Sequence, residues 1–158
     1  MSDSWPLPPP ETERREVCER LGETLADRLA AVGLCVFDCD GIMTTGNLIY
    51  GPDGEMLKEF DARDGLGLTM LQPAGIARAM LSGRESAMLA RRCRDLRFEA
   101  VRMGRFDKLA ALAEIWRETG LGPEETLFMG DDLLDLPTLA ASAVAVTVPH
   151  APQEVQAA

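Results

Sequence analysis

The sequence has few of the residues that build zinc sites, disulfide frameworks or membrane spans. Its single histidine is His150, and its four cysteines contain no C-x-x-C pair. We therefore expect no zinc site, and we expect the cysteines to be reduced thiols. No stretch approaches the ~18 apolar residues of a membrane span, and the N-terminus has no apolar signal core. These absences favour a cytoplasmic protein.

Basic clusters are also missing. The chain has 16 Lys and Arg against 26 Asp and Glu, which gives a formal net charge of −10. A chain with this charge is repelled by nucleic acid and by anionic membranes, so neither is expected as a partner. Such a protein can still bind a phosphate, provided that a metal ion, a helix N-terminus or a few well-placed cations attract it.

The order of the apolar segments predicts one α/β domain. Residues 1–12 carry four prolines and are expected to be disordered, whereas residues 13–158 are expected to form a single domain. Apolar runs predict strands at 34–37, 76–81, 98–101, 126–129 and 143–148, and helical spacing predicts helices at 17–33, 64–72, 89–96, 109–120 and 133–141. Such alternation predicts a Rossmann-like three-layer sandwich with a central parallel sheet.

One short segment departs from this alternation. Residues 48–50 and 55–60 are partly apolar and flank Gly51-Pro52-Asp53-Gly54, a typical turn sequence. We predict a small β-hairpin here, directly after the first strand.

Acidic residues follow the first predicted strand. Asp38-Cys39-Asp40-Gly41 comes directly after the apolar run 34–37. Residues i and i+2 of a strand share a face, so both carboxylates can point at one spot. Two carboxylates suit a hard cation such as Mg²⁺. Taken alone, the motif is read equally well as a loop with two solvated acids.

Polar residues mark the ends of two other segments. Ser82-Gly83-Arg84 ends the strand 76–81 and is expected to open a helix, where a hydroxyl and backbone N–H groups can bind an anion. Lys108 lies at the start of the helix 109–120. Ordinary interpretations are a turn for Ser82 and a solvated charge for Lys108.

Three carboxylates follow the strand 126–129. Asp131 lies at the strand tip and is the candidate third metal ligand. Asp132 and Asp135 are three residues apart, so they can share a helix face or favour the helix N-terminus. Since ligands of parallel sheets bind beyond the carboxyl ends of the strands, these segments together with Asp38 and Asp40 predict one site.

The motifs resemble those of the haloacid dehalogenase superfamily of phosphatases: D-x-D-G, a strand-end Ser, a downstream Lys and G-D-D-x-x-D, over about residues 33–150. Within it, the segments 37–46, 60–67, 82–84 and 130–137, with Arg92, resemble the 3-deoxy-D-manno-octulosonate 8-phosphate phosphatases. Nonulosonate 9-phosphate phosphatases share much of this pattern.

The resemblance implies a catalytic role for four residues. Asp38 is the nucleophile that forms an aspartyl-phosphate, and Asp40 is the general acid and base. Ser82 and Lys108 hold the phosphoryl oxygens as charge redistributes.

The resemblance also implies a metal site and a substrate site. Mg²⁺ is held by the Asp38 carboxylate, the Asp40 backbone carbonyl and Asp131, while Asp132 and Asp135 orient Lys108 or metal-bound waters. The implied substrate-binding residues are Asp40, Asp61, Ala62, Arg63, Asp64, Gly65, Thr69, Arg84, Arg92 and Lys108.

Members of this family have no large cap domain, and the resemblance implies a homotetramer in which the hairpin packs against neighbouring subunits. Three departures from the family pattern stand out. Asp61 occupies a position that is usually Asn, and Thr69 occupies one that is often basic. Relatives also continue into a glycine-rich tail beyond the position of Ala158, so we expect a truncated end or a different closure of the site.

We interpret the chain as a Mg²⁺-dependent phosphatase of 3-deoxy-D-manno-octulosonate 8-phosphate, which belongs to the synthesis of lipopolysaccharide precursors. One alternative is a phosphatase of a nonulosonate 9-phosphate or another small sugar phosphate. Another is a non-catalytic domain of the same fold with an assembly or regulatory role. Loss of Asp38 or Asp40 would be expected in such a domain, and both are present.

Overall fold

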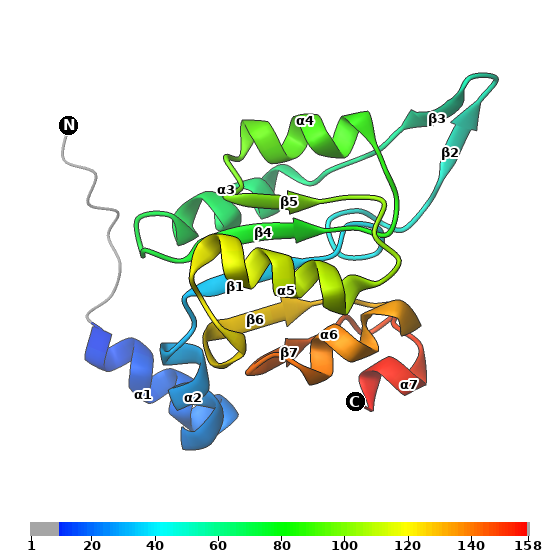
Figure 1. Cartoon of the computed structure of the whole chain (residues 1–158). Coiled ribbons are helices and arrows are strands. Elements are labelled where there is room, and N and C mark those ends of the chain that lie inside the picture. The colour runs from blue at the N-terminus through cyan, green and yellow to red at the C-terminus, as the bar shows by residue number, and fades with distance from the viewer. Residues whose placement is uncertain (1–9, 158) are drawn as a thin grey trace, which may run out of the picture.

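Five short apolar segments form the central sheet. The structure, a computed structural model, describes residues 10–157. Every pairing in the sheet is parallel, and the strand order is β5-β4-β1-β6-β7 (Figure 1). The strands are β1 (Leu34–Phe37), β4 (Ala77–Leu81), β5 (Ala100–Arg102), β6 (Thr126–Met129) and β7 (Val144–Val146). These runs are apolar because a parallel sheet is covered on both faces. The predicted α/β sandwich is confirmed.

Helices cover both faces of the sheet. One face packs against α5 (Lys108–Thr119), α6 (Leu136–Ala140) and α7 (Gln153–Gln156), and α5 and α6 cross in front of the strands in Figure 1. The other face packs against α3 (Ala62–Leu71) and α4 (Ala87–Asp95). Within β4, Ala79 and Leu81 belong to the first core and Met80 to the second, as the alternation of a strand requires.

The N-terminal region forms two helices where one was predicted. They are α1 (Pro10–Leu21) and α2 (Glu23–Ala30), separated by Gly22. Gly22 has φ +83°, a conformation that favours glycine and interrupts the helix. A disordered segment was predicted for residues 1–12, and residues 1–9 of it lie outside the described residues. Residues 10–12 already belong to α1.

The predicted hairpin is confirmed. Strands β2 (Ile49–Gly51) and β3 (Gly54–Leu57) pair antiparallel, and β3 ends three residues earlier than predicted. The hairpin projects beyond the carboxyl ends of the sheet strands (Figure 1). It is the only regular element between β1 and α3, so this segment contains no large cap.

Two predicted boundaries beside the site differ from the structure, and one short helix was not predicted. Helix α4 begins at Ala87 and not at Ser82. The segment 133–141 starts as a 3-10 turn, Leu133–Asp135, before α6. Helix α7 was not predicted, because its four residues are too few for a periodic signal. Within residues 10–157 no helix has the length and apolar character that crossing a membrane requires.

The carboxyl end of β1 is the switch point of the sheet. From β1 the chain builds β4 and β5 on one side and then β6 and β7 on the other. Ligands of open parallel sheets bind where the strand order reverses in this way. Asp38 directly follows β1, so the first acidic motif lies at this point.

Candidate active site

Asp38 is buried at the end of β1. Its backbone N–H continues the parallel ladder by donating to the Met129 carbonyl at 2.9 Å, and its side chain is only 7% exposed. Burial raises the pKa of Asp38 to about 6, although Lys108 partly offsets this rise. The site therefore holds a carboxylate with unfavourable solvation, which a nearby cation would stabilise.

Lys108 supplies a fixed positive charge beside Asp38. Its Nζ lies 2.9 Å from Asp38 Oδ1 and 2.6 Å from Asp135 Oδ1. Lys108 is the first residue of α5, whose N-cap Asp107 accepts a hydrogen bond from the Ala110 N–H. Burial alone would lower the pKa of Lys108, but Asp38 and Asp135 outweigh burial and raise it. The ammonium therefore stays charged.

The carboxylates around Lys108 contain a suitable place for a divalent cation. Ligand atoms of Asp38, Asp131 and Asp135 all lie within 4.8 Å of one another. Asp131 Oδ1 is buried and has no hydrogen-bond partner among residues 10–157, and burial followed by the charge of Asp135 raises the pKa of Asp131. A buried and unpartnered carboxylate oxygen is a fitting ligand for a hard cation.

Asp135 has a different role from Asp131. Its Oδ2 accepts from the backbone N–H groups of Asp131 (3.1 Å) and Asp132 (3.0 Å), while its Oδ1 is occupied by Lys108. Both oxygens are therefore engaged. Asp135 shapes the loop and orients Lys108, which leaves Asp38 and Asp131 as the carboxylates available to a metal.

Asp132 caps the turn that contains Asp135. It is exposed, and its side chain accepts from the Leu133 N–H at 2.6 Å, while its own N–H donates to Asp135 Oδ2. Of the two roles that the spacing allowed, the structure shows the one at the helix N-terminus. An orienting role for Asp132 toward metal-bound water stays a prediction.

Gly41 permits the close approach of the two acidic loops. Its φ is +99°, and a Cβ at this position would lie 1.9 Å from Asp131 Oδ2. Any side chain at residue 41 would therefore displace a predicted metal ligand. The D-x-D-G motif needs its glycine here for space as well as for conformation.

Ser82 lies one strand away from Asp38, at the same edge of the sheet. It directly follows β4, which pairs with β1, and it is buried. Its Oγ accepts from the Arg84 N–H at 3.2 Å. The prediction that Ser82 opens a helix is wrong, because Ser86 is the N-cap of α4 and accepts from the Leu89 N–H.

Asp40 contacts a lysine that sequence analysis missed. Its Oδ1 pairs with Lys58 Nζ, and its Oδ2 lies 3.6 Å from Arg84 Nε. Lys58 follows the hairpin, and its side chain is only 2% exposed. A single lysine beyond a hairpin carries no sequence signal, since nothing in its local spacing indicates burial.

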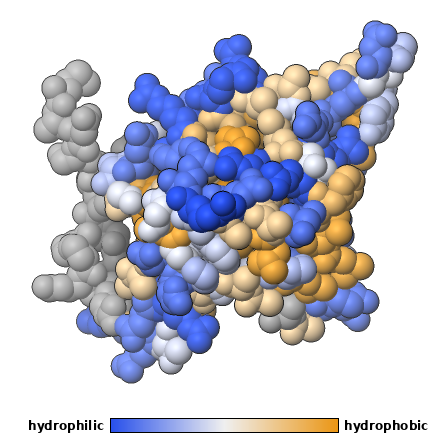
Figure 2. Space-filling model, in the orientation of Figure 1, coloured by the Kyte–Doolittle hydropathy of each residue, from blue (hydrophilic) through white to orange (hydrophobic). Residues whose placement is uncertain are grey.

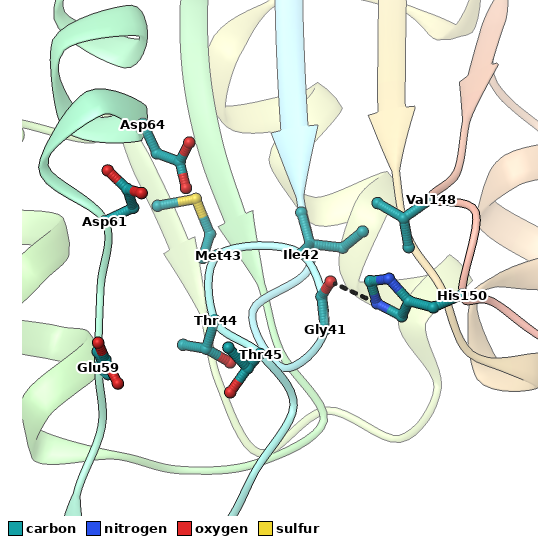
Figure 3. A pocket seen from close by; sticks show the side chains of 10 residues that line it. All are labelled: Gly41, Ile42, Met43, Thr44, Thr45, Glu59, Asp61, Asp64, Val148 and His150. Atoms are coloured by element: carbon teal, nitrogen blue, oxygen red, sulfur yellow. Dashed lines mark hydrogen bonds between the residues drawn. The ribbon is translucent and has the colours of Figure 1, made fainter.

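A pocket of about 370 Å³ opens beside these motifs. Figure 3 shows Thr44, Asp64 and His150 at its walls, on segments that follow β1, begin α3 and follow β7. His150, which sequence analysis left without a role, has its Nε2 3.2 Å from the Gly41 carbonyl (Figure 3). Asp61 also lines the pocket, so part of the predicted substrate-binding segment faces it.

Asp61 and Arg63 form an ion pair at the start of α3. Arg63 Nη2 lies 2.9 Å from Asp61 Oδ2, and Asp61 caps the helix by accepting from the Arg63 N–H. Arg63 therefore compensates the additional negative charge of Asp61. Ala62, the next residue of the predicted substrate-binding segment, is the first residue of α3.

Arg92 joins α4 to this turn. Its Nη2 donates to the Asp61 carbonyl at 3.0 Å, and its guanidinium lies over the Phe60 ring. Gly65 makes room for it, because a Cβ there would lie 2.4 Å from Arg92 Nη2. Thr69 directs its hydroxyl to its own helix by donating to the Gly65 carbonyl.

Comparisons with known proteins place this site in context. No protein-family model matches the chain. It is 38% identical over 128 residues to a 3-deoxy-D-manno-octulosonate 8-phosphate phosphatase from Haemophilus influenzae, which covers 81% of this chain and 71% of that protein. The cobalt-bound structure of the Haemophilus influenzae phosphatase matches with a TM-score of 0.81 and 39% identity, over 83% of this chain and 77% of that one. The phosphatase from Moraxella catarrhalis, solved with magnesium, phosphate and KDO, matches with a TM-score of 0.80 and 34% identity, over 83% and 75%.

Proposed function

This chain belongs to the 3-deoxy-D-manno-octulosonate 8-phosphate phosphatase family of the haloacid dehalogenase superfamily, and from that membership we propose that it hydrolyses this phosphate ester. The products are the free sugar acid and inorganic phosphate. The observation that carries the proposal is the buried Asp38 at the switch point of the sheet, with Lys108 Nζ 2.9 Å from its carboxylate.

Two aspartates perform the chemistry. Asp38 attacks phosphorus and the bond from phosphorus to the sugar oxygen breaks, which leaves an aspartyl-phosphate. Asp40 gives its proton to the departing sugar oxygen and then takes a proton from the water that hydrolyses the intermediate. Lys108 and Ser82 flank Asp38 and hold the phosphoryl oxygens as charge redistributes.

Mg²⁺ would be held by the Asp38 carboxylate, the Asp40 backbone carbonyl and Asp131. The unpartnered Asp131 oxygen and the raised pKa values of Asp38 and Asp131 support this set. When bound, the ion supplies positive charge that offsets repulsion between the carboxylates and the phosphate dianion. Asp135 stays outside the metal set because both of its oxygens are engaged, Oδ1 by Lys108 and Oδ2 by the backbone N–H groups of Asp131 and Asp132.

The pocket beside Asp61 and Asp64 is the proposed place of the sugar acid. Arg92 donates to the carbonyl of Asp61, which lines the pocket, and Arg84 lies 3.6 Å from Asp40; both guanidinium groups suit a carboxylate. Asp61 stands where the family pattern usually has Asn, but its ion pair with Arg63 reduces the repulsion of an anionic substrate. A nonulosonate 9-phosphate is the competing substrate, since Asp61 and Thr69 both depart from the usual pattern.

A homotetramer that closes the site is part of the proposal, as is a cytoplasmic role in making lipopolysaccharide precursors. Large apolar side chains are exposed on the hairpin, among them Ile49, Met56 and Leu57. Figure 2 shows further apolar surface on the side of the molecule where the strands end. Phe106 and Leu133, in the segments that follow β5 and β6, are exposed as well. Exposed apolar surface of this kind supports subunit packing.

Phosphate release from a panel of esters tests the proposal. The panel contains the octulosonate 8-phosphate, a nonulosonate 9-phosphate and hexose phosphates, each with Mg²⁺ and with EDTA. We expect Mg²⁺-dependent turnover that prefers the octulosonate ester. Preference for another ester would refute the proposed substrate assignment. An absence of turnover on all esters would refute the proposed phosphatase activity and favour a non-catalytic role.

A further inference from the structure

The chain has two lysines, and both lie beside the D-x-D-G motif. All other basic side chains besides His150 are arginines, so Lys58 and Lys108 are the only ammonium groups on side chains. Both are buried, and each contacts one aspartate of the D-x-D-G motif. Lys108 pairs with Asp38, and Lys58 pairs with Asp40. The function proposed above uses the first pair and leaves the second without a role.

Lys58 belongs to a polar network that joins the hairpin to the site. Its Nζ pairs with Asp40 Oδ1 and lies 3.4 Å from Glu55 Oε1. Glu55 is on β3, and its Oε2 accepts from Ser86 Oγ at 2.5 Å. The base of the hairpin is therefore tied to the D-x-D-G loop and to the N-terminus of α4.

Arg84 connects the same network to the other strand of the hairpin. Its Nη2 donates to the Tyr50 hydroxyl on β2 at 2.8 Å and lies 3.6 Å from Glu55 Oε1. Its Nε lies 3.6 Å from Asp40 Oδ2 and has no hydrogen-bond partner in the part of the chain that the structure describes. Asp40 Oδ1 is thus paired with Lys58, whereas Oδ2 faces Arg84, which was predicted to bind the substrate.

A lysine ammonium can serve both carboxylates from one buried position. It is a compact point charge with three N–H donors, so it can pair with two carboxylates at once. Lys58 reaches Asp40 and Glu55 from a side chain that is only 2% exposed. Without it, the two carboxylates would face each other in a partly buried site, which is unfavourable.

We propose that Lys58 is a positioning residue: its ammonium holds Oδ1 of Asp40, so that Oδ2 is presented to the oxygen of the leaving group. This inference rests on the proposed function, in which Asp40 protonates that oxygen. It also implies that the hairpin helps to hold Asp40 in place, because Glu55 lies on β3 and Lys58 directly follows it. The side chain acts through Asp40 and does not contact the substrate.

The test compares two leaving groups. The sugar alkoxide of the octulosonate 8-phosphate needs a proton, whereas the p-nitrophenolate of p-nitrophenyl phosphate departs without one. For Lys58→Met, we expect the single-turnover rate of cleavage with the sugar ester to fall about 100-fold, the cost typical of a misplaced catalytic group. The burst of p-nitrophenolate and the KM of the sugar ester should change less than about threefold, since Asp38 and Lys108 are intact.

Three controls separate positioning from structural damage. Arg91→Met removes an exposed cation of α4 that pairs only with Asp95 in the described residues, and it should leave both rates unchanged. Lys58→Met combined with Asp40→Asn should be no slower on the sugar ester than Asp40→Asn alone, because the two residues act as one unit. Circular dichroism and thermal melting check the fold, and Lys58→Gln replaces Lys58→Met where the latter does not fold.

Equal losses with the two leaving groups, or additive losses in the double variant, would overturn the positioning role. An unchanged sugar-ester rate in both Lys58 variants would overturn it as well. Wild-type protein and Asp38→Asn are assayed in parallel. An inactive wild type would refute the proposed function together with this inference, whereas an active wild type with unaffected Lys58 variants would refute the inference alone.

Discussion

Replacement of Gly41 by alanine is expected to impair Mg²⁺ binding and activity far more than it lowers the stability of the fold. Gly41 lies between the two aspartate loops with φ +99°, and a Cβ at this position would lie 1.9 Å from Asp131 Oδ2 and 2.5 Å from Asp131 Cγ. The carboxylate of Asp131 cannot stay in place, because carbon and oxygen atoms in contact are normally about 3.3 Å apart.

The clash at Gly41 sets the size of this effect. The Asp131 carboxylate must move by about 1.4 Å, the difference between an ordinary contact of about 3.3 Å and 1.9 Å. Displacement of a catalytic group by about 1 Å costs roughly 100-fold in rate. The positive φ adds a separate penalty of about 1–2 kcal/mol for any residue with a Cβ. We therefore expect Gly41→Ala to lose at least about 100-fold in kcat/KM and to need much more Mg²⁺.

Gly75→Ala is the matched control. Gly75 also has a positive φ, +77°, but a Cβ there meets nothing within 4 Å. Both variants should lose about 1–2 kcal/mol of unfolding free energy from the backbone alone. Only Gly41→Ala should lose activity, which urea unfolding and Mg²⁺ titrations of phosphate release would measure. If Gly41→Ala and Gly75→Ala had the same Mg²⁺ requirement and the same turnover, the assignment of Asp131 to the metal would be refuted.

The remaining predictions concern single side chains. Asp38→Asn should abolish phosphate release and leave the circular dichroism spectrum unchanged, and appreciable residual turnover would contradict the nucleophile assignment. Asp131→Ala should raise the Mg²⁺ concentration needed for half-maximal activity, and an unchanged requirement would exclude Asp131 as a ligand. Glu99→Gln should destabilise the fold by about 1–3 kcal/mol at neutral pH, because it leaves the fully buried guanidinium of Arg78 without its anion. Solvent screens part of this interaction, since the Glu99 side chain is 39% exposed. Burial raises the pKa of Glu99, but hydrogen bonds from Arg78 outweigh it and the net pKa is lowered. The pair therefore stabilises the wild type above about pH 4.3, and this contribution is lost as the pH falls through the lowered pKa. Urea unfolding at several pH values would show a smaller acid-dependent loss in the variant, and identical pH profiles would contradict this account.

The order of elements and the positions of the motif residues could be read from the sequence. Residues 34–37 and 126–129 were predicted as strands with the bounds that the structure has, because buried parallel strands are continuous apolar runs. The stop of α5 at Gly120 was also predictable, since this glycine adopts the left-handed conformation of a helix C-cap. These signals are local, so a single sequence contains them.

Helix boundaries next to the site were predicted less well. Ser82 and Ser86 are both serines before a helical pattern, and only the contacts of Ser86 with Leu89 and Glu55 distinguish the cap. Asp132 and Asp135 have the spacing of one helix face, but a 3-10 turn places one in solvent and the other in the core. Such choices depend on which group finds a buried partner.

Local patterns predicted the parallel α/β sheet, the hairpin after the first strand, and the polar residues at the edge of the sheet, which are Asp38, Asp40, Ser82, Lys108 and Asp131. The partners of these residues could be identified only in the folded chain. Lys58 meets Asp40 across 18 positions, and Lys108 meets Asp135 across 27. The physical reason is that burial and charge pairing depend on distances in space, which the sheet order sets and local spacing does not contain.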